Sequence, residues 1–117
     1  GSFSVVCRAY LRRGPHTGKT FVVKSIEKAN LSAKDKKNLF SEVQILQSLR
    51  HPHIVDVYQF FQDDSQLYFV VIEYVMGGEL FNRIVKKSFY NEKEARDLSW
   101  ILLDTIKFCH DRGVVHR

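Results

Sequence analysis

Short apolar runs alternate with polar or glycine-containing segments in the first 75 residues of the chain. The runs cover residues 5–11 (VVCRAYL), 21–26 (FVVKSI), 54–61 (IVDVYQFF) and 67–75 (LYFVVIEYV). All four are rich in the β-branched and aromatic residues that favour extended backbone, so they predict strands. Turn residues separate the first run from the second and the third from the fourth, which predicts two hairpins in an antiparallel sheet.

Between the second and third runs the hydrophobic spacing changes from two residues to that of a helix. Ser32 and Asp35 have the spacing of a capping box and predict the start of this helix. The apolar residues that follow at helical spacing are Leu39, Val43, Leu46 and Leu49. The dipeptide His51-Pro52 predicts its end.

Residues 76–117 have a mainly helical pattern. Residues 79–85 predict a short helix, and Asn91 with Glu94 predicts the cap of a longer one that ends at Gly113. One face of the longer helix carries Ala95, Leu98, Leu102, Ile106 and Cys109. Little of this chain is left to cover that face, which indicates part of a larger domain.

Composition adds few constraints to this picture. The chain has 117 residues, of which 44% are hydrophobic and 26% charged, as is typical of one soluble globular domain. It has no apolar run of membrane-spanning length and no cleavable signal pattern. Cys7 and Cys109 lack the spacing of a metal or disulfide motif, so we expect free thiols in a reducing compartment such as the cytoplasm.

The net charge of +5 comes partly from lysines within residues 28–37. A nucleic-acid-binding patch would interleave such charges with exposed aromatic residues, and this segment contains none. We therefore interpret it as the solvated start of a helix. The five histidines do not form a metal-binding pattern, because thiol or carboxylate partners at ligand spacing are missing.

The segment GPHTGKT, residues 14–20, is similar to a phosphate-binding P-loop. Only three residues separate its two glycines, whereas the motif needs four, and a predicted strand follows where a P-loop would open a helix. A hairpin loop between two strands is the simpler interpretation.

The order of several short motifs is more specific than any one of them. GSFSVV, FVVK, a helix glutamate, HPHIV, EYVMGGELF and HDRGVVHR follow one another along the whole chain. Together they resemble eukaryotic protein kinases, and most closely the calcium/calmodulin-dependent Ser/Thr kinase group. The resemblance implies an α+β fold: a kinase N-lobe and hinge in residues 1–75, with an antiparallel sheet and one helix, then the start of a helical C-lobe in residues 76–117.

GSFSVV resembles the second half of the kinase glycine-rich loop. The resemblance implies that Gly1, Ser2, Phe3 and Ser4 lie near ATP phosphates, with Ser4 in place of the third glycine. Val6 would then cover adenine.

The resemblance also implies a catalytic ion pair. Lys24 of FVVK would hold the α- and β-phosphates, and Glu42 in the first helix would hold Lys24 in place. A lysine ammonium is flexible and needs such a fixed carboxylate. The simpler alternative for each is a solvated surface residue.

The remaining implied ATP contacts lie near the hinge. Ile72 would gate the back of the adenine pocket, the backbone of residues 73–75 (Glu73 to Val75) would bind the adenine edge, and Glu79 would meet the ribose and a substrate arginine. Two departures from the family pattern stand out. Val22 occupies a position that is usually alanine, and LYFVVIE is one residue longer than usual, which demands a bulge or a change of side-chain parity.

The resemblance implies that the parent protein transfers the γ-phosphoryl group of ATP to protein hydroxyls, using Mg²⁺. The chain ends one residue before the expected catalytic aspartate, and the D-F-G metal ligand also lies beyond it, so we expect this chain alone to be inactive. The alternative is a pseudokinase scaffold that binds partners without catalysis. The implied partners are ATP, a protein substrate with basic residues around the phosphosite, and a regulatory protein. We expect no binding to nucleic acid or membrane.

Overall fold

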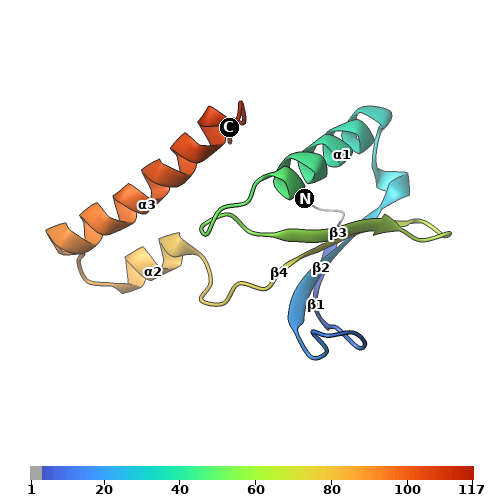
Figure 1. Cartoon of the computed structure of the whole chain (residues 1–117), viewed down its shortest axis with the longest axis horizontal. Helices are drawn as coiled ribbons and strands as arrows, with labels where there is room; N and C mark the ends of the chain where they lie inside the picture. The colour runs from blue at the N-terminus through green and yellow to red at the C-terminus, as the bar shows by residue number, and fades with distance from the viewer. Residues whose placement is uncertain (1–3) are drawn as a thin grey trace. The chain divides into compact units, whose positions relative to one another are not determined.

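The computed structural model describes residues 4–117 and places them in two compact units (Figure 1). The first unit contains the chain up to Arg50 together with Val55–Tyr74, and the second contains His51–Ile54 and Val75–Arg117. The predicted phosphate-loop residues Gly1, Ser2 and Phe3 lie outside the described residues.

The first unit is a four-stranded antiparallel sheet with one long helix. Its elements are β1 (Ser4–Tyr10), β2 (Thr20–Glu27), the 3₁₀ helix η1 (Lys28–Asn30), α1 (Ala33–Ser48), β3 (Val57–Gln62) and β4 (Leu67–Glu73). The strand order is β1-β2-β4-β3, and every neighbouring pair is antiparallel. The sequence prediction of four strands and one intervening helix is confirmed, although it missed η1.

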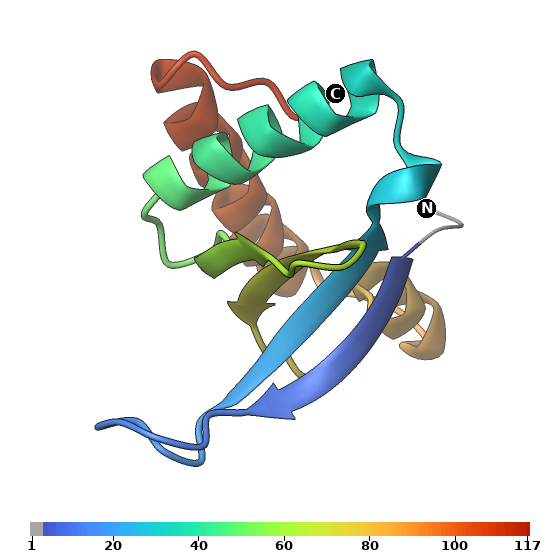
Figure 2. The ribbon, with the colours of Figure 1, turned by 90° about the vertical axis from the view of Figure 1, so that its right-hand side faces the viewer.

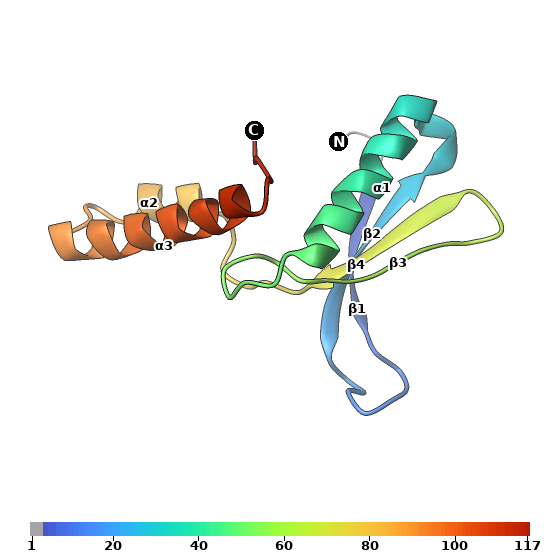
Figure 3. The same cartoon turned by 45° about the horizontal axis from the view of Figure 1, so that its top comes forward.

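The segment that is similar to a P-loop is a hairpin loop, as predicted. The amide of Gly18 donates to the carbonyl of Leu11 at 2.9 Å, and the amide of Leu11 donates to the carbonyl of Lys19 at 3.0 Å. Gly14 and Gly18 have φ angles of 104° and 88°, which a residue with a Cβ adopts only with strain. Thr20 then begins β2 rather than a helix. The loop extends from the sheet on the side away from α1 (Figure 3).

The capping box predicted at the start of α1 is confirmed. The Asp35 amide donates to Ser32 Oγ at 3.1 Å, and the Ser32 amide donates to Asp35 Oδ2 at 3.1 Å. The hydrogen bonds from the Ser32 side chain and backbone hold the pKa of the Asp35 carboxyl below its usual value. The helix ends at Ser48, before His51-Pro52, as the sequence predicts.

The core of the first unit lies where α1 packs over one face of the sheet (Figure 2). Its buried members are Ile26, Val43, Val57, Tyr68 and Val70. Leu39 and Leu46 of α1 pack against this cluster, which confirms the predicted apolar stripe of the helix.

Two strand boundaries differ from the sequence prediction by more than one residue. β3 begins at Val57 rather than at Ile54, because the Ile54 amide closes a turn by donating to the carbonyl of His51 at 3.2 Å. β4 ends at Glu73, two residues earlier than predicted.

The irregularity expected in the last strand lies in its neighbour. β4 pairs with β2 without interruption from Leu67 to Glu73. The register instead shifts between Val57 and Gln59, where β3 pairs with β4. One extra residue in β3 therefore provides the bulge.

The second unit contains two helices, α2 (Leu80–Lys86) and α3 (Glu92–Asp111), both close to their predicted bounds. The predicted cap of α3 is present, since the Glu94 amide donates to Asn91 Oδ1 at 2.8 Å. Lys87 Nζ lies 2.7 Å from Glu94 Oε1, and this contact is the largest cause of the lowered pKa of Glu94. Part of the predicted apolar face of α3 is exposed, including Leu102 at 47% and Ile106 at 44%.

The loop His51–Ile54 belongs to the second unit through contacts of His51 with α3. His51 Nε2 lies 3.4 Å from Asp104 Oδ2, and its ring centroid lies 4.7 Å from that of Phe108. The two cysteines are free thiols, as predicted. None of the helices in the described part of the chain is long and apolar enough to cross a membrane.

Candidate functional site

The inner face of the sheet, which is the face that packs against α1, has a covered half and an open half. In the covered half, Ile26, Tyr68 and Val70 are each only 7% exposed. The open half consists of Val6, Arg8, Val22, Lys24 and Ile72, which share one side of the sheet because they alternate with outward residues. Ile72 marks the boundary between the halves, because it also packs against the core cluster. Val6 is 60% exposed, although its strand continues the same sheet.

Strand register brings the predicted adenine-contacting residues together. Val22 is the cross-strand partner of Ile72, and both side chains are half-buried. Val6 is the cross-strand partner of Lys24 on the next pair of positions. The result is an apolar surface of β-branched side chains with one lysine at its border. Such a surface can pack against a flat apolar ring, while the ammonium group can bind an anion.

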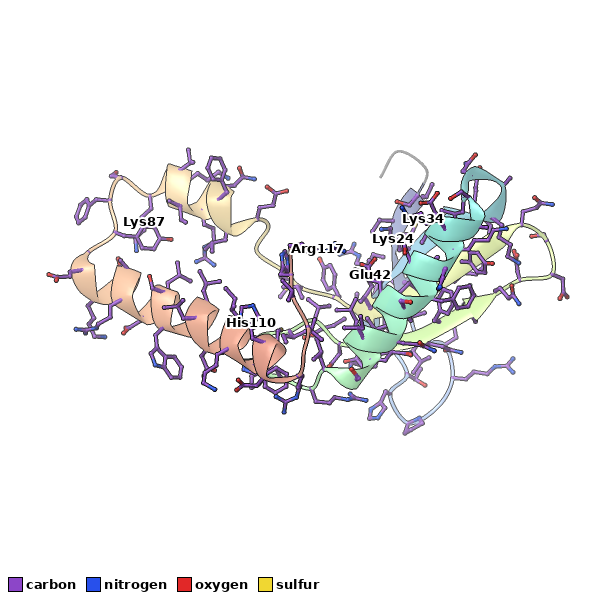
Figure 4. The ribbon with its side chains drawn as sticks, turned by 90° about the horizontal axis from the view of Figure 1, so that it is seen from above. Lys24, Lys34, Glu42, Lys87, His110 and Arg117 are labelled. Atoms are coloured by element: carbon purple, nitrogen blue, oxygen red, sulfur yellow. The ribbon has the colours of Figure 1, made fainter. Side chains whose placement is uncertain are left out.

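Lys24 and Glu42 do not form an ion pair in the part of the chain that the structure describes. Glu42 is exposed, but it directly precedes buried Val43 and lies one helical turn before Leu46, which packs on the core. It therefore lies at the edge of the core-facing stripe of α1 and not on the opposite side. In Figure 4 the labelled Glu42 side chain is on the flank of α1 where the Lys24 label also lies. Their pairing stays a prediction.

Glu73 ends β4 and makes two hydrogen bonds to one residue. Its amide donates to the carbonyl of Asp56 at 2.9 Å, and its side-chain Oε2 accepts from the Asp56 amide at 3.2 Å. The remaining predicted contacts, Val75 and Glu79, belong to the second unit. Val75 is 61% exposed, and Glu79 is the N-cap residue of α2 without a side-chain capping bond.

Arg8 and the side chain of Tyr74 belong to the surroundings of this surface. The sequence prediction included Tyr74 only through its backbone in the hinge, and it missed Arg8. The Arg8 guanidinium carbon lies 5.8 Å from the Tyr74 ring centroid and 6.0 Å from that of Tyr10. These distances fit weak cation–π contacts at an exposed position. Strand alternation alone could have found Arg8, because it lies two residues after Val6 and therefore faces the same side.

The described residues include no group of three or more His, Cys, Asp or Glu side chains that could hold a metal ion. Lys24 and Arg8 are the cationic residues of the open half, and the ammonium of Lys24, which borders the apolar surface, is suited to bind a phosphate.

The open half is an apolar surface bordered by a lysine, and it lies beside a helix. Comparison with known protein families identifies the class of protein to which this arrangement belongs. The model of the protein kinase domain matches residues 1–117, so the chain belongs to the protein kinase domain family.

Among individual relatives, the chain is 40% identical to a calcium/calmodulin-dependent protein kinase type 1 from Macrobrachium nipponense, over all of this chain and 33% of the relative. It is also 40% identical to a calcium/calmodulin-dependent protein kinase type II from Caenorhabditis briggsae, over all of this chain and 21% of the relative. The resemblance to this kinase group is thereby confirmed. The chain spans a third or less of the length of these two relatives.

The structure is similar to a solved kinase as well. The crystal structure of Rad53 in complex with AMP-PNP matches all of this chain and 29% of that chain, with a TM-score of 0.78 and 35% sequence identity. The predicted fold, a kinase-like N-lobe sheet and helix followed by early C-lobe helices, is confirmed.

Proposed function

We propose that the open half of the inner face forms one wall of the ATP site of a Ser/Thr protein kinase. The observation that carries this proposal is the position of Lys24, the cross-strand partner of exposed Val6, at the border of an uncovered apolar surface. In the full-length protein the domain transfers the γ-phosphoryl group of ATP to protein hydroxyls. Residues 1–75 form its N-lobe and hinge, and residues 76–117 begin its C-lobe.

The apolar part of this surface binds the adenine ring. Val6 and Val22 pack on one side of the ring, and Ile72, which pairs with Val22, closes the back of the pocket. The main chain from Glu73 to Val75 meets the edge of the ring, and Glu79 meets the ribose. Val22 has two methyl groups more than alanine, so it leaves less space for the adenine ring.

The polar part of the site binds phosphates. Lys24 holds the α- and β-phosphates, and Ser4 lies over them. A movement of α1 would bring Glu42 to Lys24 and fix its ammonium, because Glu42 lies at the edge of the core-facing stripe. Magnesium would be held by residues of the parent protein outside this chain.

The names of the relatives support a proposal about regulation, and Glu79 supports a proposal about the substrate. Several relatives are named as calcium/calmodulin-dependent kinases, which supports a regulatory protein as partner. Glu79 offers a carboxylate to an arginine near the phosphosite, so the substrate is a basic protein segment. The free thiols fit a cytoplasmic protein.

Phosphate transfer by the full-length parent protein tests this proposal. The protein is incubated with γ-labelled ATP, Mg²⁺ and three basic peptides that differ only in carrying serine, threonine or tyrosine. We expect label on serine and threonine and none when Mg²⁺ is chelated. Absence of transfer to any peptide would favour the pseudokinase alternative, and absence of ATP binding would in addition contradict the proposed ATP site.

A further inference from the structure

The last residue of β4 has an unusual hydrogen-bond pattern. In an antiparallel sheet, the two residues of a hydrogen-bonded pair exchange two main-chain bonds. Glu73 and Asp56 make the first of these, since the Glu73 amide donates to the Asp56 carbonyl at 2.9 Å. The second is diverted, because the Asp56 amide donates to the Glu73 side-chain Oε2 at 3.2 Å and not to the Glu73 main-chain carbonyl.

The Glu73 carboxylate thus accepts the hydrogen bond from the Asp56 amide. In regular antiparallel pairing, the Glu73 main-chain carbonyl would accept that bond. The departure comes directly before the bulge of β3, where the register shifts between Val57 and Gln59. Bulges re-aim a strand and commonly lie beside functional sites. At this end of the sheet the main-chain carbonyl of Glu73 is released from pairing with β3.

The Glu73 side chain lies on the outer face, opposite the open half. Its cross-strand partner is Phe21, whereas the open-half residues Val22 and Ile72 pair at the neighbouring position. Phe21 packs edge-on against Tyr58, with ring centroids 5.0 Å apart. The carboxylate therefore lies on the opposite side of the sheet from the proposed nucleotide site. It affects the main chain at Glu73 and does not itself contact a nucleotide on the inner face.

We propose that the Glu73 side chain is a positioning residue for base recognition, an inference that rests on the ATP site proposed above. By accepting the Asp56 amide, the carboxylate keeps the Glu73 main-chain carbonyl free to accept a hydrogen bond from the exocyclic amino group of adenine. A carbonyl can only accept, so the same device disfavours a purine whose 6-position carries an oxygen. The side chain thereby selects a 6-amino purine without touching it.

The test compares two nucleotides that differ only in the amino group. Glu73→Met removes the acceptor, so the Asp56 amide returns to the main-chain carbonyl and the contact with adenine is lost. In the full-length protein we expect ATP affinity to fall about threefold to tenfold, because one hydrogen bond to the adenine amino group is lost. The affinity for purine riboside triphosphate, which lacks the amino group, should stay within about twofold.

Two further variants serve as controls. Glu73→Gln keeps a side-chain oxygen that can accept from the Asp56 amide, so it should bind ATP like the wild type. Glu27→Met removes a glutamate at the opposite end of β2, where the carboxylate accepts from the Asn30 side chain at 2.7 Å. It should alter neither nucleotide affinity. Thermal unfolding of each variant verifies that the domain remains folded.

Equal weakening of both nucleotides by Glu73→Met would overturn the inference, because the side chain would then support only the shape of the hinge. Unchanged ATP affinity would overturn it too, since the carbonyl would not depend on the carboxylate. If the wild-type protein bound neither nucleotide, the ATP site itself would be wrong. That outcome is distinct from both of the others.

Discussion

The covered and open halves of the inner face share strands β2 and β4, yet their residues differ in burial. Ile26 in the covered half is 7% exposed, and Val6 in the open half is 60% exposed. Both are β-branched residues on one side of one sheet, so sequence pattern alone cannot separate core from binding surface. Two features of the fold separate them. Ile26 belongs to the core cluster with Val43 of α1, whereas Val6 lies on the edge strand β1, where the outward-facing Val5 is also 64% exposed.

This comparison predicts opposite consequences for substitutions in the two halves. In the covered half, side chains stabilise the fold through apolar area removed from water. In the open half, the exposed apolar side chains contribute no such stabilisation to the free protein. Binding of a ligand better explains why apolar residues occupy these positions. Changes in the open half should therefore alter nucleotide use more than stability, and changes in the covered half should do the reverse.

The largest expected effect is the loss of turnover in Lys24→Met. Methionine keeps the apolar stem of this half-buried side chain and removes the charge that holds the phosphates in the proposed site. We expect turnover to fall by roughly 10²–10³-fold, as is typical when a preorganised electrostatic contact is removed. Thermal unfolding should change little. Lys34→Met, at an exposed position early in α1, is the matched control and should retain wild-type turnover.

A smaller loss is expected for Glu42→Gln, which would weaken the charge-assisted contact with Lys24 that is proposed above. Turnover should fall by roughly tenfold to a hundredfold, because a hydrogen bond between charged groups contributes about 1.5–3 kcal/mol. The side chain is exposed, so the free energy of unfolding should stay nearly constant. A variant that lost stability but kept turnover would place Glu42 among the structural residues, and the comparison between the halves would fail at α1.

Ile26→Val tests the covered half. The substitution removes one buried methylene and should lower the free energy of unfolding by about 0.5–1.5 kcal/mol. Denaturant titration measures this loss. The KM for ATP should remain at the wild-type value, although Ile26 is only two residues from Lys24. A raised KM without loss of stability would show that the boundary between the halves lies elsewhere.

Local signals predicted the ends of the helices well. Ser32 with Asp35 and Asn91 with Glu94 are reciprocal capping boxes in the structure, because each depends only on residues three positions apart. The hairpin at residues 14–20 was predictable for the same reason, since its glycines and the strand after it are neighbours in sequence.

Features that depend on distant residues were not predictable. The apolar pattern at Ile54 favours a strand, but the structure uses His51–Ile54 as a turn whose His51 contacts Asp104 and Phe108. The bulge expected near the end of β4 lies in β3 instead. The hydrogen bond from Asp56 to the Glu73 side chain joins residues 17 positions apart, and no local signal marks it.

The smallest expected effect is that of Lys19→Ala in the hairpin loop. Lys19 is the residue that made this loop resemble a phosphate-binding site, yet its Nζ donates to the Tyr58 hydroxyl at 3.1 Å and lies 4.7 Å from the centre of that ring. These contacts are exposed, so their loss should cost no more than about 1 kcal/mol of stability.

Because Lys19 contacts Tyr58 on the outer face and not the open half, the nucleotide affinity of the intact protein should stay within about twofold of the wild-type value. Tyr58→Phe removes the hydroxyl alone and should cause a similar or smaller change in stability. A loss of ATP affinity as large as that of Lys24→Met would place phosphate binding in the loop. Equilibrium ATP binding to the three variants, measured side by side, decides between the two locations.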